Sequence, residues 1–439
     1  MSARGVRRVA VVAGVLGLAI AACVEDATSP AQCPDFCPGG QIATVESLLA
    51  TAIGRDSTFR GYVERDQAFM MLAATLPQID SRPIFETLPI ATRFRINTTG
   101  DDTTTAPIVV DSAKLTLTLL RRDTAAHNLR LAFYRLPLGI DSTSTFAGLA
   151  PDFAAAPMRV VNLDSLLAQP GLVDSVTGDR VVRVDSVRHA VTVSLKFDTT
   201  QLSFVEPDSG KVAFGVRVTA DSLASVALGA SEEGSGPRIV WFNRVDSAGT
   251  LVPRDSQPRG LLFDGFVFDP PAPALDSNLI VGGVPSARTL LRFTVPRGIR
   301  DSSQIIRATL LLVPVAPAPG VPVDSFFLSL SRLAGDFGFK SPLVVDSFTA
   351  NTPLLSPGGG STDTVRIEVT RLLRAWQLDT TAATAAYLRL LTLDRGDTAR
   401  LSGWEGTTFT ALRLYSSRTP AFRPGLHVTF IPRFKFGVP

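Results

Sequence analysis

The sequence predicts an all-β protein with two tandem antiparallel β-sandwich domains of jelly-roll-like form. Three observations predict it: residues alternate between apolar and polar with a period of two, turn-forming residues separate these runs, and similar segments recur at a domain-sized interval. The chain has 439 residues, of which 45% are hydrophobic and 19% charged. A chain of that length and composition can form more than one hydrophobic core.

The alternating runs cover residues 114–119, 191–197, 212–218 and 426–430. Such runs bury one face and leave the other in water, as strands of an antiparallel sheet do. Asp-Ser and Asp-Thr pairs recur between them, and their short polar side chains bond to nearby backbone and end strands.

One short helix is expected near the C-terminus. Thr370 opens it, and Val369, Leu372, Leu373 and Trp376 are spaced as a single helical face. Trp376 therefore belongs to the core of its domain. Trp241 ends an apolar strand, and we expect it to be packed as well.

A divergent duplication links the two halves. Three pairs of segments are similar, with offsets between 187 and 199 residues: 92–94 with 291–293, 112–117 with 306–311, and 236–242 with 423–430. We therefore predict two homologous sandwiches over residues 41–250 and 261–439, joined by a linker over 251–260 that holds two prolines. Phe263, Phe266 and Phe268 alternate like the first strand of the second domain.

The second half also resembles a known family. Its segments 287–293, 305–312, 369–376, 414–418 and 423–426 are similar to DNRLRE-type β-sandwich domains, relatives of carbohydrate-binding modules on bacterial surface proteins. The resemblance implies a sandwich and a surface location rather than an activity.

The N-terminus carries an export signal. Arg4, Arg7 and Arg8 precede an apolar run over 9–22, which is shorter than the roughly 20 residues that a bilayer-spanning helix needs. The sequence Ile-Ala-Ala-Cys that ends at Cys23 resembles the lipobox of bacterial lipoproteins. It implies a signal peptide over 1–22, a lipidated Cys23, and an outer-membrane location on the periplasmic or cell-surface face. The alternative is an ordinary secretory peptide.

Residues 23–40 form a Pro- and Gly-rich tether that holds the other two cysteines, Cys33 and Cys37. A local disulfide between them agrees with an exported protein. We expect no metal site there, because the four ligands that zinc requires are not present nearby.

The charge balance argues against nucleic acid as a partner. Loss of the three leader arginines leaves 40 basic residues against 40 acidic ones, so the mature chain is neutral overall. The membrane, reached through the N-terminal lipid, and a glycan or an envelope protein are the expected partners.

Recognisable catalytic motifs are missing from the sequence. It contains only His127, His189 and His427, and it has no nucleophile elbow, zinc-protease helix or phosphate loop. His427 lies between two apolar residues of a strand and should face solvent. Carboxylates such as Glu232, Glu233, Asp394, Asp397 and Glu405 leave a glycosidase open as an alternative. We therefore expect that the protein is not an enzyme and that it uses no cofactor.

Trp404 is the best candidate for a sugar-stacking platform. Glycines and a charge surround it, and no alternation requires its burial, so Glu405 and Arg400 could bind sugar hydroxyls beside it. The alternative is that Trp404 plugs the end of a sandwich. We therefore expect a non-catalytic, lipid-anchored module that binds a glycan or cell-wall polymer. The alternatives are a structural or interaction subunit of an outer-membrane complex or adhesin, or a polysaccharide-degrading enzyme.

Overall fold

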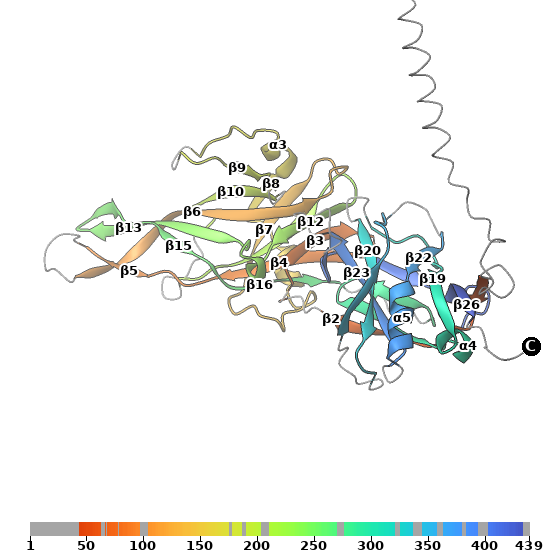
Figure 1. Ribbon diagram of the computed structural model, residues 1–439. Helices are drawn as coiled ribbons and strands as arrows, with labels where there is room; N and C mark the ends of the chain where they lie inside the picture. The colour runs from red at the N-terminus through yellow and green to blue at the C-terminus, as the bar shows by residue number, and fades with distance from the viewer. Residues whose placement is uncertain are drawn as a thin grey trace, which may run out of the picture.

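The predicted all-β sandwich class is confirmed (Figure 1). The computed structural model describes residues 44–62, 66, 68–77, 79–96, 104–174, 178–186, 190–202, 210–269, 276–320, 325–336, 345–357, 363–379, 383–393 and 403–432. Two sandwiches lie along the long axis of the molecule, the first to the left and the second to the right in Figure 1.

The first sandwich is a single sheet whose two layers are joined where β12 pairs with the end of β6 across a β-bulge. One layer runs β14-β13-β6, with β15 on β13, β5 and β10 on β6, and β9 on β10. The other runs β12-β3-β4-β11-β7-β8, with β16 on β4. The strand bounds are β3 Met70–Leu76, β4 Ile79–Thr87, β5 Arg93–Arg95, β6 Thr105–Arg122, β7 Arg130–Leu136, β8 Arg159–Asn162, β9 Val182–Asp185, β10 Ala190–Asp198, β11 Ala213–Thr219, β12 Ala224–Gly229, β13 Arg238–Ser247, β14 Thr250–Pro253, β15 Gln257–Arg259 and β16 Leu261–Phe268.

The second sandwich has two separate sheets. The smaller has the order β1-β26-β19-β22, and the larger has the order β21-β20-β23-β18-β17-β25, with β2 on β18 and β24 on β23. The strand bounds are β1 Val45–Leu49, β2 Ile53–Tyr62, β17 Leu279–Gly282, β18 Ser286–Phe293, β19 Ser303–Leu312, β20 Phe326–Leu333, β21 Val345–Asn351, β22 Val365–Glu368, β23 Ala385–Leu393, β24 Gly403–Trp404, β25 Ala411–Leu414 and β26 Gly425–Pro432.

Helices in the described residues are short. They are α2 Ala150–Ala154, α3 Leu163–Leu167, η2 Ser231–Glu233, α4 Arg297–Arg300 and α5 Thr370–Leu378. The helix predicted from Thr370 is α5, and it buries Leu372, Leu373 and Trp376 against the second core. Trp376 and Trp241 are both almost fully buried, as predicted.

The predicted boundaries at 250 and 261 do not separate the two sandwiches. β1 and β2, from the start of the chain, pair with β26 and β18 of the second sandwich. β16, predicted as the first strand of the second domain, pairs with β4 of the first. The described part of the chain thus starts in the second sandwich with β1, builds the first sandwich over residues 68–269, and then returns to the second.

The segment predicted as a linker is also folded. Residues 251–260 contain most of β14 and all of β15, which both pair with β13. Their prolines, Pro253 and Pro258, lie in short strands at the edge of the layer, where a missing backbone N–H costs little. The prolines were therefore a misleading sign of a linker.

The strand registers show an internal repeat whose alignment differs from two of the three predicted segment pairs. β4 is the equivalent of β18, so the match of 92–94 with 291–293 is wrong, and 112–117 aligns with 307–312 rather than 306–311. Leu115 of β6 lies between β10 and β13, as Leu310 of β19 lies between β22 and β26. After β22 the chain continues into α5, whereas after β10 it makes one turn, in which Leu202 N–H bonds to the Asp198 carbonyl. In the residues described up to 202, a turn thus stands where the second sandwich begins α5.

The repeat also shows that the sandwiches exchange strands. β2 precedes β3 in the chain as β16 precedes β17, and each pairs across a β-bulge, β2 with β18 and β16 with β4. Each two-strand segment, β1 with β2 and β15 with β16, therefore completes the sandwich of the other repeat.

Each sandwich has its own apolar core, and a smaller cluster joins them. In this junction cluster Phe409 of the second half packs with Phe266 of β16, the ring centroids 6.5 Å apart. Arg121 of β6 donates to the Thr407 carbonyl at 2.6 Å, and both residues are buried. The two sandwiches are therefore in direct contact.

Candidate functional site

Trp404, the predicted sugar platform, lies at the junction of the two sandwiches. Its ring packs against Phe69, which precedes β3, with centroids 4.1 Å apart, and it is half-buried. Residues 403–410, which we call the junction strap, carry Trp404, Thr407 and Phe409 into contacts with the first sandwich. This position matches the alternative in which Trp404 fills a packed end.

Glu405 is engaged inside the protein. It is 7% exposed and accepts hydrogen bonds from Arg288 Nε and Nη2 at 3.0 and 2.7 Å, and from the Ser286 hydroxyl at 2.9 Å. The Tyr387 ring lies under the Arg288 guanidinium, 5.2 Å away. Both oxygens of Glu405 are thus occupied, which corrects the expectation that it binds a sugar hydroxyl.

Glycine lets the strap approach the second sandwich closely. Gly282 has a φ of +86°, and a Cβ there would lie 2.7 Å from the Thr410 carbonyl oxygen. Gly283 N–H donates to the same carbonyl at 2.8 Å. A side chain at Gly282 would therefore push the end of the strap away.

The other predicted site residues, Arg400, Cys23, Cys33 and Cys37, lie outside the described residues. Asp394 and Asp397 also lie outside them. Glu232 and Glu233 form η2 on the first sandwich, whereas Glu405 is in the junction strap. The described carboxylates among those considered for catalysis therefore come from two different elements, η2 and the junction strap.

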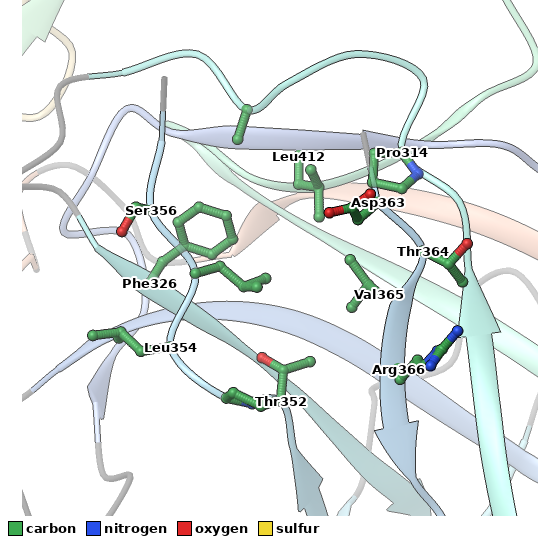
Figure 2. Close-up of a pocket in the computed structure, with 13 residues that line it drawn as sticks. Pro314, Phe326, Thr352, Leu354, Ser356, Asp363, Thr364, Val365, Arg366 and Leu412 are labelled. Carbon is green, nitrogen blue, oxygen red and sulfur yellow. The ribbon is translucent and has the colours of Figure 1, made fainter. Parts of the chain in front are cut away.

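A groove of about 800 Å³ lies in the second sandwich (Figure 2). Its floor is apolar, and its exposed rim carries Ser356, Asp363, Thr364 and Arg366 beside Pro353 and Leu354. Phe326 from β20 and Val365 from β22 lie on the floor, and Thr352 is held in place because its hydroxyl accepts the Leu328 N–H at 2.9 Å. The residues that line the groove are Pro314, Ala318, Phe326, Thr352, Pro353, Leu354, Leu355, Ser356, Asp363, Thr364, Val365, Arg366 and Leu412.

The groove residues were missed by sequence reasoning. They come from β20, β22, β25 and the chain segments beside these strands, and they form no motif along the sequence. The exposed Leu354 beside Ser356 is the one local signal, because a large apolar residue there has no strand alternation to explain it.

A second hollow, of about 540 Å³, lies on the outer face of the small sheet of the second sandwich. Two contacts span this face: Arg307 Nε forms an ion pair with Glu368 at 3.1 Å, and His427 Nε2 lies 3.8 Å from Glu46. The His427 side chain is 43% exposed, so the prediction that it faces solvent is confirmed.

Among the described residues, no three His, Cys, Asp or Glu side chains are grouped so that they could hold a metal ion. In the same part of the chain, no helix has the length and apolar character needed to cross a bilayer. No family model matches the chain, and no curated protein matches it.

Proposed function

We propose that this protein is a non-catalytic, lipid-anchored module of the outer membrane that binds a glycan or cell-wall polymer. The observation that carries the proposal is the groove of the second sandwich, with Phe326 and Val365 on its floor and the exposed Ser356, Asp363 and Thr364 at its rim. Sugar rings combine apolar C–H faces with hydroxyl groups, and an apolar floor with a polar rim can contact both. About 800 Å³ is large enough for a short oligosaccharide.

Substitution at the rim tests the groove. In Ser356→Trp an indole fills the opening, so we expect retention on the bound polysaccharide to fall by about tenfold or more. Ser302→Trp adds the same side chain at an exposed position outside the groove and serves as the matched control. Affinity electrophoresis against common polysaccharides measures retention, and the melting temperature verifies folding. Equal retention of both variants would show that the groove is not the glycan-binding site.

The anchor is tested separately. Metabolic labelling with an alkyne fatty acid should mark the wild-type protein and the Cys33→Ser variant, and Cys23→Ser should abolish the label, since only Cys23 follows a lipobox-like sequence. Release of unlabelled wild-type protein into the medium would contradict the anchor. Hydrolysis of any common polysaccharide by the purified chain would replace the binding module with an enzyme.

A second candidate function is attachment to an envelope protein. β5 and the outer ends of β6 and β13 project from the first sandwich at the left of Figure 1. Arg93 and Arg95 are exposed on this projection, and the guanidinium of Arg254 fixes β5 by donating to the Arg95 carbonyl. Co-purification of a partner that is lost in an Arg93→Glu, Arg95→Glu variant would favour attachment over glycan binding.

A further inference from the structure

Another recess, of about 530 Å³ and distinct from both the groove and the hollow on the small sheet, opens in the second sandwich where the exchanged strand β2 meets β18. It lies apart from the groove, with which it shares no lining residue. Its lining consists of Gly54, Arg55, Asp56, Ser57, Arg292, Asp336, Ser417 and Arg418.

The lining is positively charged. It holds three guanidinium groups against two carboxylates. Arg292 is committed to Asp336, with Nε and Nη2 at 2.5 and 2.9 Å from its two oxygens. Arg55 and Arg418 are exposed, and neither has an ion-pair partner among the described residues. Two guanidinium groups are therefore available to a ligand.

Asp56 supplies an unsatisfied acceptor in the wall. Its carboxylate is 8% exposed, and Oδ2 accepts the Ser417 N–H at 2.5 Å. Oδ1 is buried without a hydrogen-bond partner in the described structure, and so is the neighbouring Ser57 hydroxyl. An unpaired buried polar group destabilises a fold, and native structures tolerate it mainly where water or a ligand completes the bonding.

The first sandwich contains the same position in a completed form. Asp264 of β16 pairs opposite Phe85 as Asp56 pairs opposite Leu291. Asp264 Oδ2 accepts the Ser231 N–H at 2.9 Å, and Oδ1 accepts the Ser231 hydroxyl. In this copy both carboxylate oxygens are satisfied within the protein.

The charges around the two positions also differ. The strand registers place Phe263 where the second sandwich has Arg55, and Glu86 where it has Arg292. Glu232 follows Ser231 as Arg418 follows Ser417. The duplicated position thus has mostly acidic groups and a fully bonded carboxylate in the first sandwich, and mostly basic groups and an unbonded carboxylate oxygen in the second.

We propose that the recess around Asp56 binds an anionic saccharide, with its acid group on Arg55 and Arg418 and a neighbouring hydroxyl directed to Asp56. Guanidinium groups match the geometry of carboxylate and phosphate oxygens, and a carboxylate accepts from a sugar hydroxyl. The shared chemistry is an acid beside hydroxyls, as in a uronate or a sugar phosphate. This inference rests on the proposed glycan-binding function and adds a second site to it.

Isothermal titration of the full chain with trigalacturonic acid, glucose 6-phosphate and neutral maltotriose tests the site. We expect at least one of the two acids to bind, and the stronger of them identifies the acid group. Arg55→Ala and Arg418→Ala should each raise its Kd by about tenfold or more, since each removes a charge-assisted contact. Arg297→Ala removes the same charge from the exposed surface of α4 and should leave the Kd unchanged.

Failure of this site can be told apart from failure of the proposed function. If neither acid binds, or if the Arg55, Arg418 double variant binds as well as wild type, the inference is overturned. The proposed function survives that result if a neutral glycan binds and Ser356→Trp removes it. If an acid binds here and Ser356→Trp has no effect on any glycan, the recess stands and the groove does not.

Discussion

Asp56 in the second strand of the fold accepts the backbone N–H of Ser417, 361 residues further along the chain. The equivalent Asp264 accepts from Ser231. In each sandwich, therefore, the strand supplied by the other repeat is fixed by an aspartate that caps a loop of its host. The exchanged strands belong to the structure of their host sandwich.

Fragments that keep each exchanged strand with its host sandwich should behave differently from fragments that end at the domain boundary predicted from the sequence, residue 250. A chain of residues 66–270 keeps β16 with β4, so we expect a cooperative thermal transition by circular dichroism. A chain of residues 41–250 lacks β16 and exposes Phe85 and Ile84, so it should melt without cooperativity. Adding a peptide of residues 41–65 to residues 276–439 should raise the melting temperature of the latter. Equally cooperative melting of residues 41–250 and 66–270 would refute the exchange.

Asp264→Asn should destabilise the first sandwich. The substitution removes the charge that strengthens the bonds from Ser231, at a cost of about 1 to 3 kcal/mol in the free energy of unfolding. Urea titration measures it. Asp269→Asn is the control, because Asp269 is exposed just beyond β16 and its one hydrogen bond to a described residue comes from its backbone N–H. A similar loss in both variants would show that the Ser231 contact is unimportant.

Trp404 and Phe69 should be energetically coupled. A double-mutant cycle with Trp404→Leu and Phe69→Leu is expected to give a coupling energy of about 0.5 to 1.5 kcal/mol, since the rings are in contact. Additive effects, together with loss of polysaccharide retention at an unchanged melting temperature, would instead restore Trp404 as a ligand platform.

Glu405→Gln should lower stability more than loss of a surface carboxylate does. It removes the charge of the carboxylate that binds Arg288, whose side chain is 17% exposed, and we expect a cost of about 3 kcal/mol. Glu368→Gln breaks the exposed pair with Arg307 and should cost less than about 1 kcal/mol. Equal costs in chemical denaturation would mean that burial does not strengthen the Arg288 pair.

Glu232 should make the first sandwich sensitive to pH. Burial raises the pKa of Glu232 above its usual value near 4.5, and the charges of Asp264 and Asp66 raise it further. The folded state thus favours the protonated carboxyl. The stability that protonation contributes is fully present below about pH 4.5 and is lost as the pH rises through the folded pKa. Glu232→Gln should therefore raise the melting temperature at pH 7 relative to wild type and show no gain at pH 4. A gain that is the same at both pH values would contradict this account.

The alternating runs were sufficient to predict the strands, because burial of one face leaves a period of two in the sequence. They were insufficient to predict pairing. Phe263, Phe266 and Phe268 read as a strand in either sandwich, and only the register with β4 assigns them to the first. Local sequence does not specify which of two similar strands becomes the pairing partner.

The candidate site was harder to predict. Trp404 looked accessible because glycines surround it, yet Phe69, which covers it, is more than 300 residues away in sequence. Glu405 was likewise paired with a distant arginine. The recess around Asp56 depends on two strands and a loop that are brought together only by the exchange. A position that the duplication makes acidic in one copy and basic in the other was visible only after the strand registers aligned the copies.

The second sandwich contains strands from both ends of the described chain, and this affects the order in which the two sandwiches can fold. A polypeptide emerges from a ribosome or a translocation channel with its N-terminal end first, so residues 68–269 can fold as soon as they have appeared. Strands β1 and β2 must wait for β18 and β26, and β26 ends at Pro432. Until β26 is released, β1 has no strand to pair with. An early stop in synthesis would leave the unpaired edge of β1 open to aggregation.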